Sequence, residues 1–302
     1  MGGAHSQEEA GPRLEKHGDN FWNARAEFKV LHMINIGTHM SLIKLKNGRF
    51  LVIDTVPLDD KLKSEFDALT EKGSLVEAVL ATHPFHTLAF PAFHEAYPSL
   101  RYYGCPRHLR NLSSIPWAGD IREQLMTWAP EVEMRIPAGA EFVAPEPERF
   151  NHFNSVWVYC KESRMLHVDD TVNYYKKEHV GVLLRLVGVK DGELGFHPSM
   201  KGPGLLPTVE APAQFKCWVE HIIADWDFGS ICCAHRDVLI GGAKQKLQMA
   251  LDDAQPLLES LAEKNRKKEE SGKGEASGSK GATESKEEEE ISKMNVHGCE
   301  CG

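Results

Sequence analysis

The sequence lacks a long hydrophobic run. No apolar stretch approaches the roughly 20 residues that a helix needs to span a bilayer. The first residues also lack the hydrophobic region of a secretory signal. These two absences predict a protein with no transmembrane segment.

A basic excess is also absent. The chain has 35 Lys and Arg residues against 44 Asp and Glu residues, which gives a formal net charge of −9. No cluster of Lys and Arg is interleaved with aromatic residues, as a nucleic-acid-binding surface requires. We therefore expect no nucleic-acid partner. A small molecule and a protein both stay open as the binding partner.

The cysteines form no disulfide framework. Their number, 7, is odd, and several lie inside apolar segments, where a free cysteine behaves as a small hydrophobic residue. Reduced thiols are typical of the cytosol, so the composition predicts a cytoplasmic protein. Near the C-terminus, Cys299 and Cys301 form with His297 a short segment that could chelate a soft metal weakly.

Both ends of the chain differ in composition from its middle. Residues 1–19 are polar, and residues 265–302 carry charge runs, such as those at 267–270 and 287–290, among Ser, Gly and Lys. Segments of this composition cannot bury enough apolar surface to fold. We predict a flexible segment at 1–19, one folded domain at 20–264 and a disordered charged tail at 265–302.

Apolar periodicity alternates between strand and helix along this domain. An Asn47-Gly48 dipeptide, typical of a two-residue hairpin turn, separates two strand-like segments. Interleaved strands and helices favour sheets packed against helices over an all-α or all-β domain. The predicted strands are 29–35, 40–46, 50–54, 75–81, 156–160 and 164–168, and the predicted helices are 58–69, 90–97 and 214–223.

A further helix is predicted at residues 247–261. Its leucines and alanines fall on one helical face. That face predicts packing on the chain's own domain. A dimer through the 247–261 helix is the alternative.

A histidine-containing segment follows the apolar run at 75–81. It reads THPFHTL from Thr82 to Leu88, with histidines at 83 and 86. Further histidines and aspartates lie at the ends of other predicted strands. Imidazole and carboxylate groups in such positions are candidate ligands of zinc or iron.

Five segments in this order resemble the metallo-β-lactamase superfamily. The superfamily has H-x-H-x-D-H where this chain has residues 83–88. Residues 50–55 resemble its (I/V)-D-(T/S) strand end, residues 151–156 its H-x-P-G-S segment, residues 165–171 its GD(T/S) turn, with Asp169 in the place of the glycine, and residues 231–235 the strand that ends on its last ligand histidine. The match spans about residues 25–262. It implies an α/β fold, an αββα sandwich of two mixed β-sheets flanked by helices.

The resemblance implies a binuclear metal site that is incomplete in this chain. Phe85, Thr87 and Leu88 stand where the superfamily has its second histidine, its motif aspartate and its third histidine. Neither metal position therefore keeps its full set of ligands. Thr87 also cannot take a proton from water, as the motif aspartate does. The residues that the resemblance retains as metal ligands are His83, His152, Asp170 and His235.

Three interpretations of these residues stay open. In the first, the chain is a non-catalytic or weakly active protein of this fold, a pseudoenzyme whose pocket binds a partner or a small molecule. In the second, the four retained ligands converge on one zinc or iron ion, with His86 as a replacement ligand if Pro84 reshapes the loop. The chain is then a mononuclear metal-dependent hydrolase. In the third, each histidine is an ordinary polar residue at a strand end.

The N-terminal residues fit a lipidation pattern. Residues 1–6, MGGAHS, match M-G-x-x-x-(S/T), the signal for N-myristoylation of Gly2. A single acyl chain binds membranes only marginally, and no basic patch accompanies it. The pattern predicts at most a weak membrane association. It adds another function class, an interaction protein that reuses the scaffold at a membrane.

Overall fold

A large mixed sheet forms the first half of the molecule. The computed structural model describes residues 14–30, 34–148, 151–176, 192–235 and 237–275. Seven of the described strands pair in the order β1-β2-β5-β6-β7-β8-β9, antiparallel from β1 to β6 and parallel from β6 to β9. They are β1 (Leu14–Lys16), β2 (Phe21–Ala26), β5 (Thr38–Lys44), β6 (Phe50–Ile53), β7 (Val76–Leu80), β8 (Tyr102–Gly104) and β9 (Trp117–Asp120).

A second mixed sheet has the order β10-β11-β12-β15-β16 among the described strands. Its strands β12 and β15 are parallel, and the other neighbours are antiparallel. Two short antiparallel strand pairs, β3 with β4 and β13 with β14, lie outside both sheets. The bounds are β3 (Lys29–Val30), β4 (Ile34–Asn35), β10 (Val132–Arg135), β11 (Trp157–Cys160), β12 (Met165–His167), β13 (Val172–Tyr174), β14 (Leu194–Phe196), β15 (Ser230–Cys232) and β16 (Val238–Leu239).

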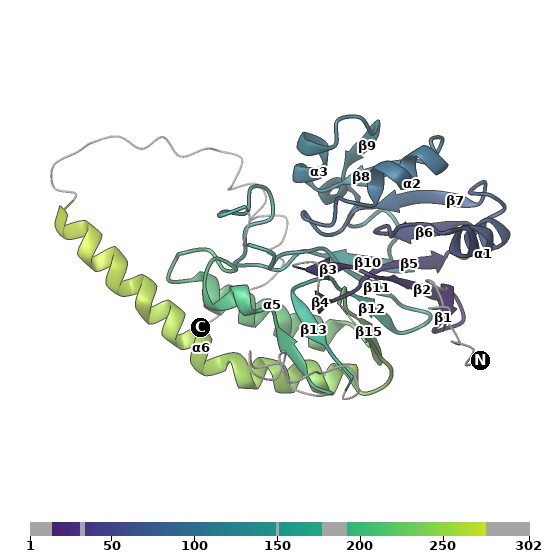
Figure 1. The fold of residues 1–302 in the computed structure, drawn as a ribbon. Helices are drawn as coiled ribbons and strands as arrows, with labels where there is room; N and C mark the ends of the chain where they lie inside the picture. Colours follow the sequence, from purple (N-terminus) through teal and green to yellow (C-terminus); the bar gives the residue numbers. More distant parts are fainter. Residues whose placement is uncertain (1–13, 31–33, 149–150, 177–191, 236, 276–302) are drawn as a thin grey trace, which may run out of the picture.

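Helices cover the outer faces of the two sheets (Figure 1). Helix α1 begins after Asp59, whose carboxylate accepts a hydrogen bond from the Leu62 N–H at 2.7 Å and so satisfies one of the free donors of the first turn. The helices are α1 (Asp60–Thr70), α2 (Phe90–Ala96), α3 (Pro106–Asn111), α5 (Ala211–Asp225) and α6 (Ala243–Glu275), with the 3-10 turns η1 (Ile121–Gln124) and η3 (Pro198–Lys201).

Three apolar layers hold these elements together. Leu42 of β5 packs with residues of α1 and α2, whereas its neighbour Ile43 faces the second sheet. This alternation follows from the strand, in which successive side chains point to opposite faces. On the far side, Trp157 of β11 packs with Phe215 of α5 and Leu247 of α6. The order helix, sheet, sheet, helix confirms the αββα sandwich.

The predicted strand at 29–35 is wrong. Its two ends form the separate strands β3 and β4, which pair with each other through Val30 and Ile34. The reason is that β2 pairs directly with β5, with Phe21 opposite Ile43. The residues between β2 and β5 therefore have no place in the sheet.

Both predicted domain boundaries also need correction. Strand β1 lies within residues 1–19, and the Leu14 N–H donates to Glu65 of α1 at 2.9 Å. Helix α6 includes residues 265–275, which the sequence analysis assigned to the tail. Ion pairs of Glu263 with Arg266 at 2.7 Å and with Lys267 at 3.3 Å support this part of the helix, because residues three and four apart are neighbours on a helix surface.

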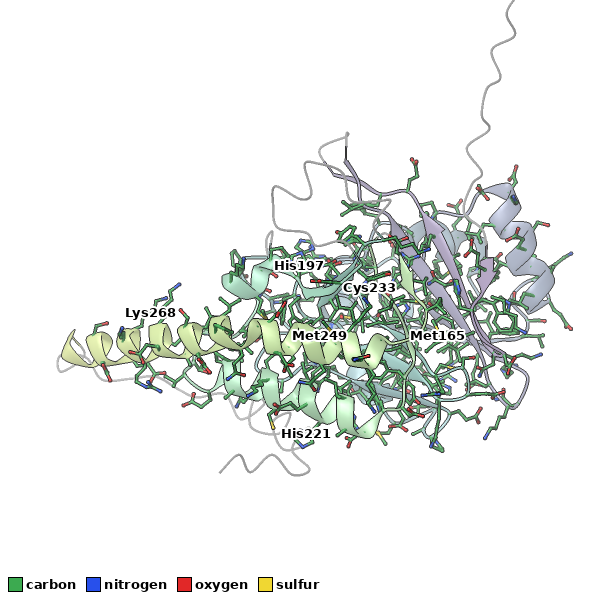
Figure 2. All side chains as sticks on the ribbon, turned by 90° about the horizontal axis from the view of Figure 1, so that it is seen from below. Met165, His197, His221, Cys233, Met249 and Lys268 are labelled. Atoms are coloured by element: carbon green, nitrogen blue, oxygen red, sulfur yellow. The ribbon has the colours of Figure 1, made fainter. Side chains whose placement is uncertain are left out.

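The apolar face predicted at residues 247–261 packs inside the chain's own core. Leu247, Leu251 and Leu258 are buried between α6 and the second sheet. This intrachain packing takes these leucines out of reach of a second copy of the chain. Figure 2 shows Met249 over the domain and Lys268 on the part of α6 that extends past it.

The described residues contain no helix of the length and apolar character needed to cross a bilayer. Gly2, the candidate for N-myristoylation, lies outside the described residues. So do His297, Cys299 and Cys301.

Gly139 is expected to be indispensable to the packing of α5. Its φ is +72°, and a Cβ there would lie 2.2 Å from the backbone oxygen of Ala211. We predict that Gly139→Ala lowers the free energy of unfolding by about 3 kcal/mol or more, from left-handed strain and overpacking together. Gly48 is the matched control, because its φ is +84° but nothing lies within 4 Å. Gly48→Ala should cost only about 1–2 kcal/mol. Equal losses in urea denaturation would contradict the packing described for Gly139.

Candidate metal centre

Polar side chains follow four strands at one edge of the sandwich. Asp54 follows β6 and His83 comes shortly after β7, while Asp170 and His235 follow β12 and β15. Strands β6 and β7 are parallel to each other, and so are β12 and β15. Carboxyl ends of parallel neighbours lie at the same edge of a sheet, which is where open α/β sheets bind ligands. The fold therefore gathers these side chains.

The buried Asp170 carboxylate is the centre of the group. Its Oδ2 lies 3.5 Å from His83 Nε2 and 3.7 Å from His152 Nδ1. Its Oδ1 lies 2.8 Å from His235 Nε2 and 3.7 Å from His86 Nε2. All four histidines that the sequence proposed as ligands, the weak candidate His86 included, thus lie within 3.7 Å of Asp170. Of these residues, His83, His86 and Asp170 have ligand atoms within 4.8 Å of one another.

The spacing of these atoms fits one metal ion. Four ligands placed tetrahedrally at about 2.0–2.1 Å from zinc lie about 3.3–3.4 Å apart. The distances of 3.5–3.7 Å from Asp170 to His83, His86 and His152 are close to that value. Within the described part of the chain, His83 Nε2 is buried without a hydrogen-bond partner. Such an atom costs about 1–3 kcal/mol, and a metal ion would satisfy it.

A histidine can bind a metal through Nε2 when Nδ1 carries the proton of the neutral ring, and the hydrogen bond that Nδ1 makes shows whether it does. His235 Nδ1 donates to the backbone oxygen of Gly37 at 2.8 Å, so Nε2, beside Asp170, is the ring nitrogen that can bind a metal. This is the tautomer that a ligand needs. His83 Nδ1 instead accepts from the Phe85 N–H at 3.2 Å. Binding a metal through His83 Nε2 would give up that bond, at a cost of about 1 kcal/mol.

A tight turn brings His86 into the site in place of Phe85. The His86 N–H donates to the oxygen of His83 at 3.1 Å, and the Thr87 N–H to the oxygen of Phe85 at 2.9 Å. The Phe85 ring stacks on His152, with 4.2 Å between ring centroids. His86 therefore faces the aspartates, as expected if the loop containing Pro84 is reshaped.

A buried polar network supports the site from below. Asp169 accepts from Thr82 Oγ1 at 2.7 Å, and its Oδ1 lies 3.3 Å from His39 Nε2 and 3.2 Å from His86 Nδ1. A carboxylate behind a ligand histidine fixes the orientation and tautomer of its ring. Asp169 has this position relative to His86. The network consists of Asn23, His39, Ser41, Asp54, Thr82, His167 and Asp169.

The pair His39 and His167 has a geometry that opposes a second metal ion. The two rings are stacked, with centroids 4.2 Å apart and 13° between their planes. The lone pairs of two such rings lie in nearly parallel planes about as far apart as the rings, so a single ion cannot lie in the plane of both rings. Each ring nitrogen also has a partner. These are Asn23 and Asp169 for His39, and Ser41 and Asp54 for His167. We therefore assign this pair to the hydrogen-bonded support and not to a metal site.

Burial and neighbouring charges set the protonation of the central residues. Burial lowers the pKa of His83 to about 3. Burial disfavours a charge on Asp170, but His235, His83 and His86 outweigh it and hold the pKa of Asp170 well below its usual value. For His86 burial is likewise outweighed, because Asp170 and Asp169 hold its pKa well above the usual value. His86 thus carries a proton that metal binding would release.

The three residues that stand at the positions of the missing motif ligands do not act as ligands themselves. Leu88 is 77% exposed, and Phe85 packs on His152. Thr87 brings only a hydroxyl where the superfamily has a carboxylate. Of the superfamily residues that would hold the second metal ion, the described part of the chain therefore keeps only His235 and Asp170.

Several residues of the site were missed by sequence reasoning. His39, Ser41 and Asn23 carry a usable signal, because they alternate with apolar residues in β5 and β2 and so face the other sheet. His197 carries no such signal. The structure places it near enough to Asp170, His152 and His235 for their charges to act on it, while burial lowers its pKa.

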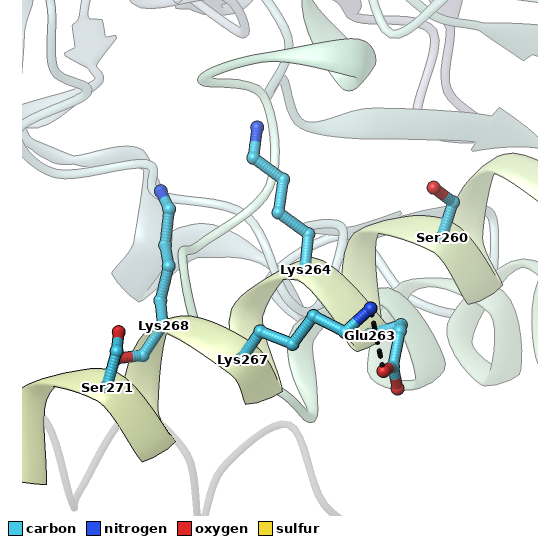
Figure 3. A pocket seen from close by; sticks show the side chains of 6 residues that line it. All are labelled: Ser260, Glu263, Lys264, Lys267, Lys268 and Ser271. Atoms are coloured by element: carbon cyan, nitrogen blue, oxygen red, sulfur yellow. Dashed lines mark hydrogen bonds and ion pairs between the residues drawn. The ribbon is translucent and has the colours of Figure 1, made fainter.

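A hollow lies on the extended half of α6, outside this site. Figure 3 shows Lys264 and Lys268 beside it, with Lys267 paired to Glu263. Its lining shares no residue with the histidine and aspartate groups described above.

Solved structures with the same fold are metallo-β-lactamases. VMB-1 superposes with a TM-score of 0.52 at 14% identity, over 81% of this chain and 98% of its own. The DIM-1 metallo-β-lactamase gives 0.51 at 13% identity, over 84% and 98%. The metallo-β-lactamase FIM-1 from Pseudomonas aeruginosa, in its mono-zinc form, gives 0.51 at 11% identity, over 84% and 96%. No protein-family model and no curated protein sequence matches the chain. The chain therefore has the metallo-β-lactamase fold, as its motifs indicated.

Thr82→Val tests the network beneath the site. The Thr82 hydroxyl donates its one proton to Asp169 and is also in hydrogen-bond contact with the carboxyl of Asp54, whose pKa burial raises, and valine has the same shape without the hydroxyl. We predict a loss of about 2–3 kcal/mol in the free energy of unfolding, because hydrogen bonds to charged groups are the stronger ones. Thr70 is the matched control. It is equally buried, but its hydroxyl bonds to the backbone groups of Phe66 and Gly73, so Thr70→Val should cost about 1 kcal/mol. A smaller loss for Thr82→Val than for Thr70→Val, measured with chelator present, would refute this assignment.

Proposed function

We propose that the chain binds one transition-metal ion and has lost the binuclear hydrolysis that the intact motif would support. The observation that carries the proposal is the placement of four imidazole nitrogens within 2.8–3.7 Å of the Asp170 carboxylate. Three imidazoles and a carboxylate form a set suited to zinc or to non-haem iron.

Two further facts support a single ion. His83 Nε2 is one of the buried side-chain atoms without a hydrogen-bond partner among the described residues, and it faces Asp170 at 3.5 Å. The structure of FIM-1 in its mono-zinc form shows that the same fold accommodates one zinc ion. The residues proposed to hold the metal are His83, His86, Asp170 and His235, with His152 at the exposed side.

The residues around the proposed metal ion would position a bound molecule more readily than they would act as an acid or a base. A zinc ion bound by such ligands acts as a Lewis acid and lowers the pKa of water. A nearby carboxylate is needed to take the proton, and the candidates here are engaged. Asp170 lies among the ligands, and Asp169 is fully buried and accepts from Thr82 and His39. We infer a non-catalytic or weakly active protein whose metal site serves binding of a partner or a small molecule.

A mononuclear metal-dependent hydrolase is the second candidate. One observation favours it: the His152 side chain is 36% exposed, whereas His83 is fully buried. The site is thus open on the side of His152, where a substrate could approach. Neutral His197 is near this side, and its Nδ1 accepts from the Ser199 N–H at 3.2 Å, so its Nε2 carries a proton that could be donated.

Metal content per chain tests the proposal. We expect about one zinc or iron ion per full-length chain by inductively coupled plasma mass spectrometry, for protein purified without chelator or affinity-tag metal. His297, Cys299 and Cys301 are replaced by alanine in every sample, so that the tail adds no metal. His83→Ala combined with His86→Ala should remove most of the metal, because it deletes two ligands.

The control for this loss is His221→Ala. His221 lies on α5, on the opposite side of α6 from His197 in Figure 2, and its replacement should leave the metal content unchanged. Unchanged metal content in the His83 and His86 double variant would reject the proposed site. Metal-free wild-type protein that takes up no zinc on soaking would reject it as well.

Turnover separates the two candidate functions. For the leading one we predict that generic esters, thioesters and lactams are hydrolysed no faster by the zinc-loaded protein than by its His152→Ala variant, since no free carboxylate accepts the proton. A robust metal-dependent rate that His152→Ala abolishes would contradict the leading function and establish the hydrolase.

A further inference from the structure

The turn that carries His86 is held from outside by α3. Two neighbouring side chains of this short helix reach the turn. His108 Nε2 lies 3.2 Å from the backbone oxygen of His86, and Arg107 donates to the backbone oxygen of Pro84 at 3.3 Å. The guanidinium of Arg107 also lies 4.6 Å from the ring centroid of Phe85. Three consecutive residues of the turn, 84–86, therefore contact α3.

The hydrogen bond between His108 and the backbone oxygen of His86 has only one possible direction. A carbonyl oxygen only accepts, so Nε2 must be the protonated nitrogen of His108. His108 therefore donates its Nε2–H to the backbone oxygen of His86, the residue proposed to replace the ligand that is missing at Phe85.

The surroundings of His108 offer no other reason for a histidine. The residue is fully buried, with the rings of Phe90 and Trp117 at 5.1 and 5.5 Å. Its Nδ1 has no hydrogen-bond partner within the described part of the chain. A buried lone pair of this kind is a cost that an apolar side chain would avoid. The bond to His86 is the one contact of the ring that an apolar residue could not make.

We propose that His108 and Arg107 of α3 are positioning residues that make His86 a metal ligand in this chain. His108 fixes the carbonyl of His86 and Arg107 fixes that of Pro84, so the turn keeps the one conformation in which the His86 ring lies between Asp169 and Asp170. This inference rests on the proposed metal site and assigns part of its geometry to residues outside the ligand set.

The same contacts extend to His152. Phe85, which Arg107 covers, stacks on the His152 ring with an angle of 26° between the planes. Arg107 is itself held by Glu148 at 2.6 Å. The α3 segment thus reaches two of the proposed ligands, one through a backbone oxygen and one through an aromatic ring.

Zinc affinity of the full-length protein tests the proposal, measured by competition with a chromophoric chelator. We expect His108→Phe to weaken zinc binding about 10-fold to 100-fold, the range typical of residues that orient a ligand. His108→Gln retains an N–H donor and should lose less. His94→Phe is the control, because His94 is a partly buried histidine on α2 that packs on the Tyr102 ring and does not contact the turn.

A double-mutant cycle distinguishes positioning from general damage. In a His86→Ala background, His108→Phe should cause no further loss of zinc affinity, because the ligand that it positions is already gone. If His108→Phe lowers affinity equally with and without His86, the positioning role is overturned. Unchanged affinity in His108→Phe overturns it too.

The failure of this inference can be distinguished from the failure of the proposed metal site. If His108→Phe does not fold, Arg107→Ala replaces it in the same cycle, since Arg107 lies nearer the surface and its contact to Pro84 is lost without a cavity in the core. If the wild-type protein binds no zinc, the proposed function fails, and this inference fails with it. Zinc binding in the wild type with an additive cycle rejects the inference alone.

Discussion

The buried carboxylate of Asp170 is the constraint on which the rest of the site depends. An ionised group out of water is costly unless opposite charge and hydrogen bonds surround it. Here four histidines from three segments surround it, at 2.8–3.7 Å. Those segments adjoin strands of both sheets. The contacts of the histidines with this one carboxylate therefore hold the two sheets together at this edge of the sandwich. A metal ion would serve the same purpose more completely, because it also satisfies His83 Nε2.

The departures from the superfamily motif are linked in space. His86 is one place out of register, and Asp169 stands where the motif has glycine. In the structure these two residues lie 3.2 Å apart, with Asp169 behind the His86 ring. Phe85, which takes the place of the second histidine, stacks on His152. The altered residues therefore form contacts with one another that preserve a ligand set, although not the ligand set of the motif. A retained set of candidate ligands with an unavailable base is the arrangement that the proposed function, metal binding without efficient hydrolysis, requires.

The sequence predicted the sandwich well because its signals are local. A near-continuous apolar run marked β7, and the Asn47-Gly48 turn marked the hairpin of β5 and β6. The strand β15 was indicated by the superfamily resemblance. The candidate ligands His83, His152, Asp170 and His235 followed from the resemblance of their segments to the superfamily's motifs. The support beneath them could not be predicted, because it depends on which strands lie opposite each other. His39 meets Asp169 only because β5 and β12 face each other across the sandwich. His108 meets His86 only because α3 packs back on the end of β7.

X-ray absorption spectroscopy of the zinc-loaded protein, at one equivalent of zinc per chain, tests the central claim most directly. The account predicts nitrogen and oxygen ligands at about 2.0–2.1 Å with the multiple-scattering signature of at least three imidazoles. It also predicts no metal neighbour. A second metal at about 3.5–4 Å would show that the binuclear site survives. Sulfur at about 2.3 Å would show that the cysteines, and not His83, His86, Asp170 and His235, hold the metal.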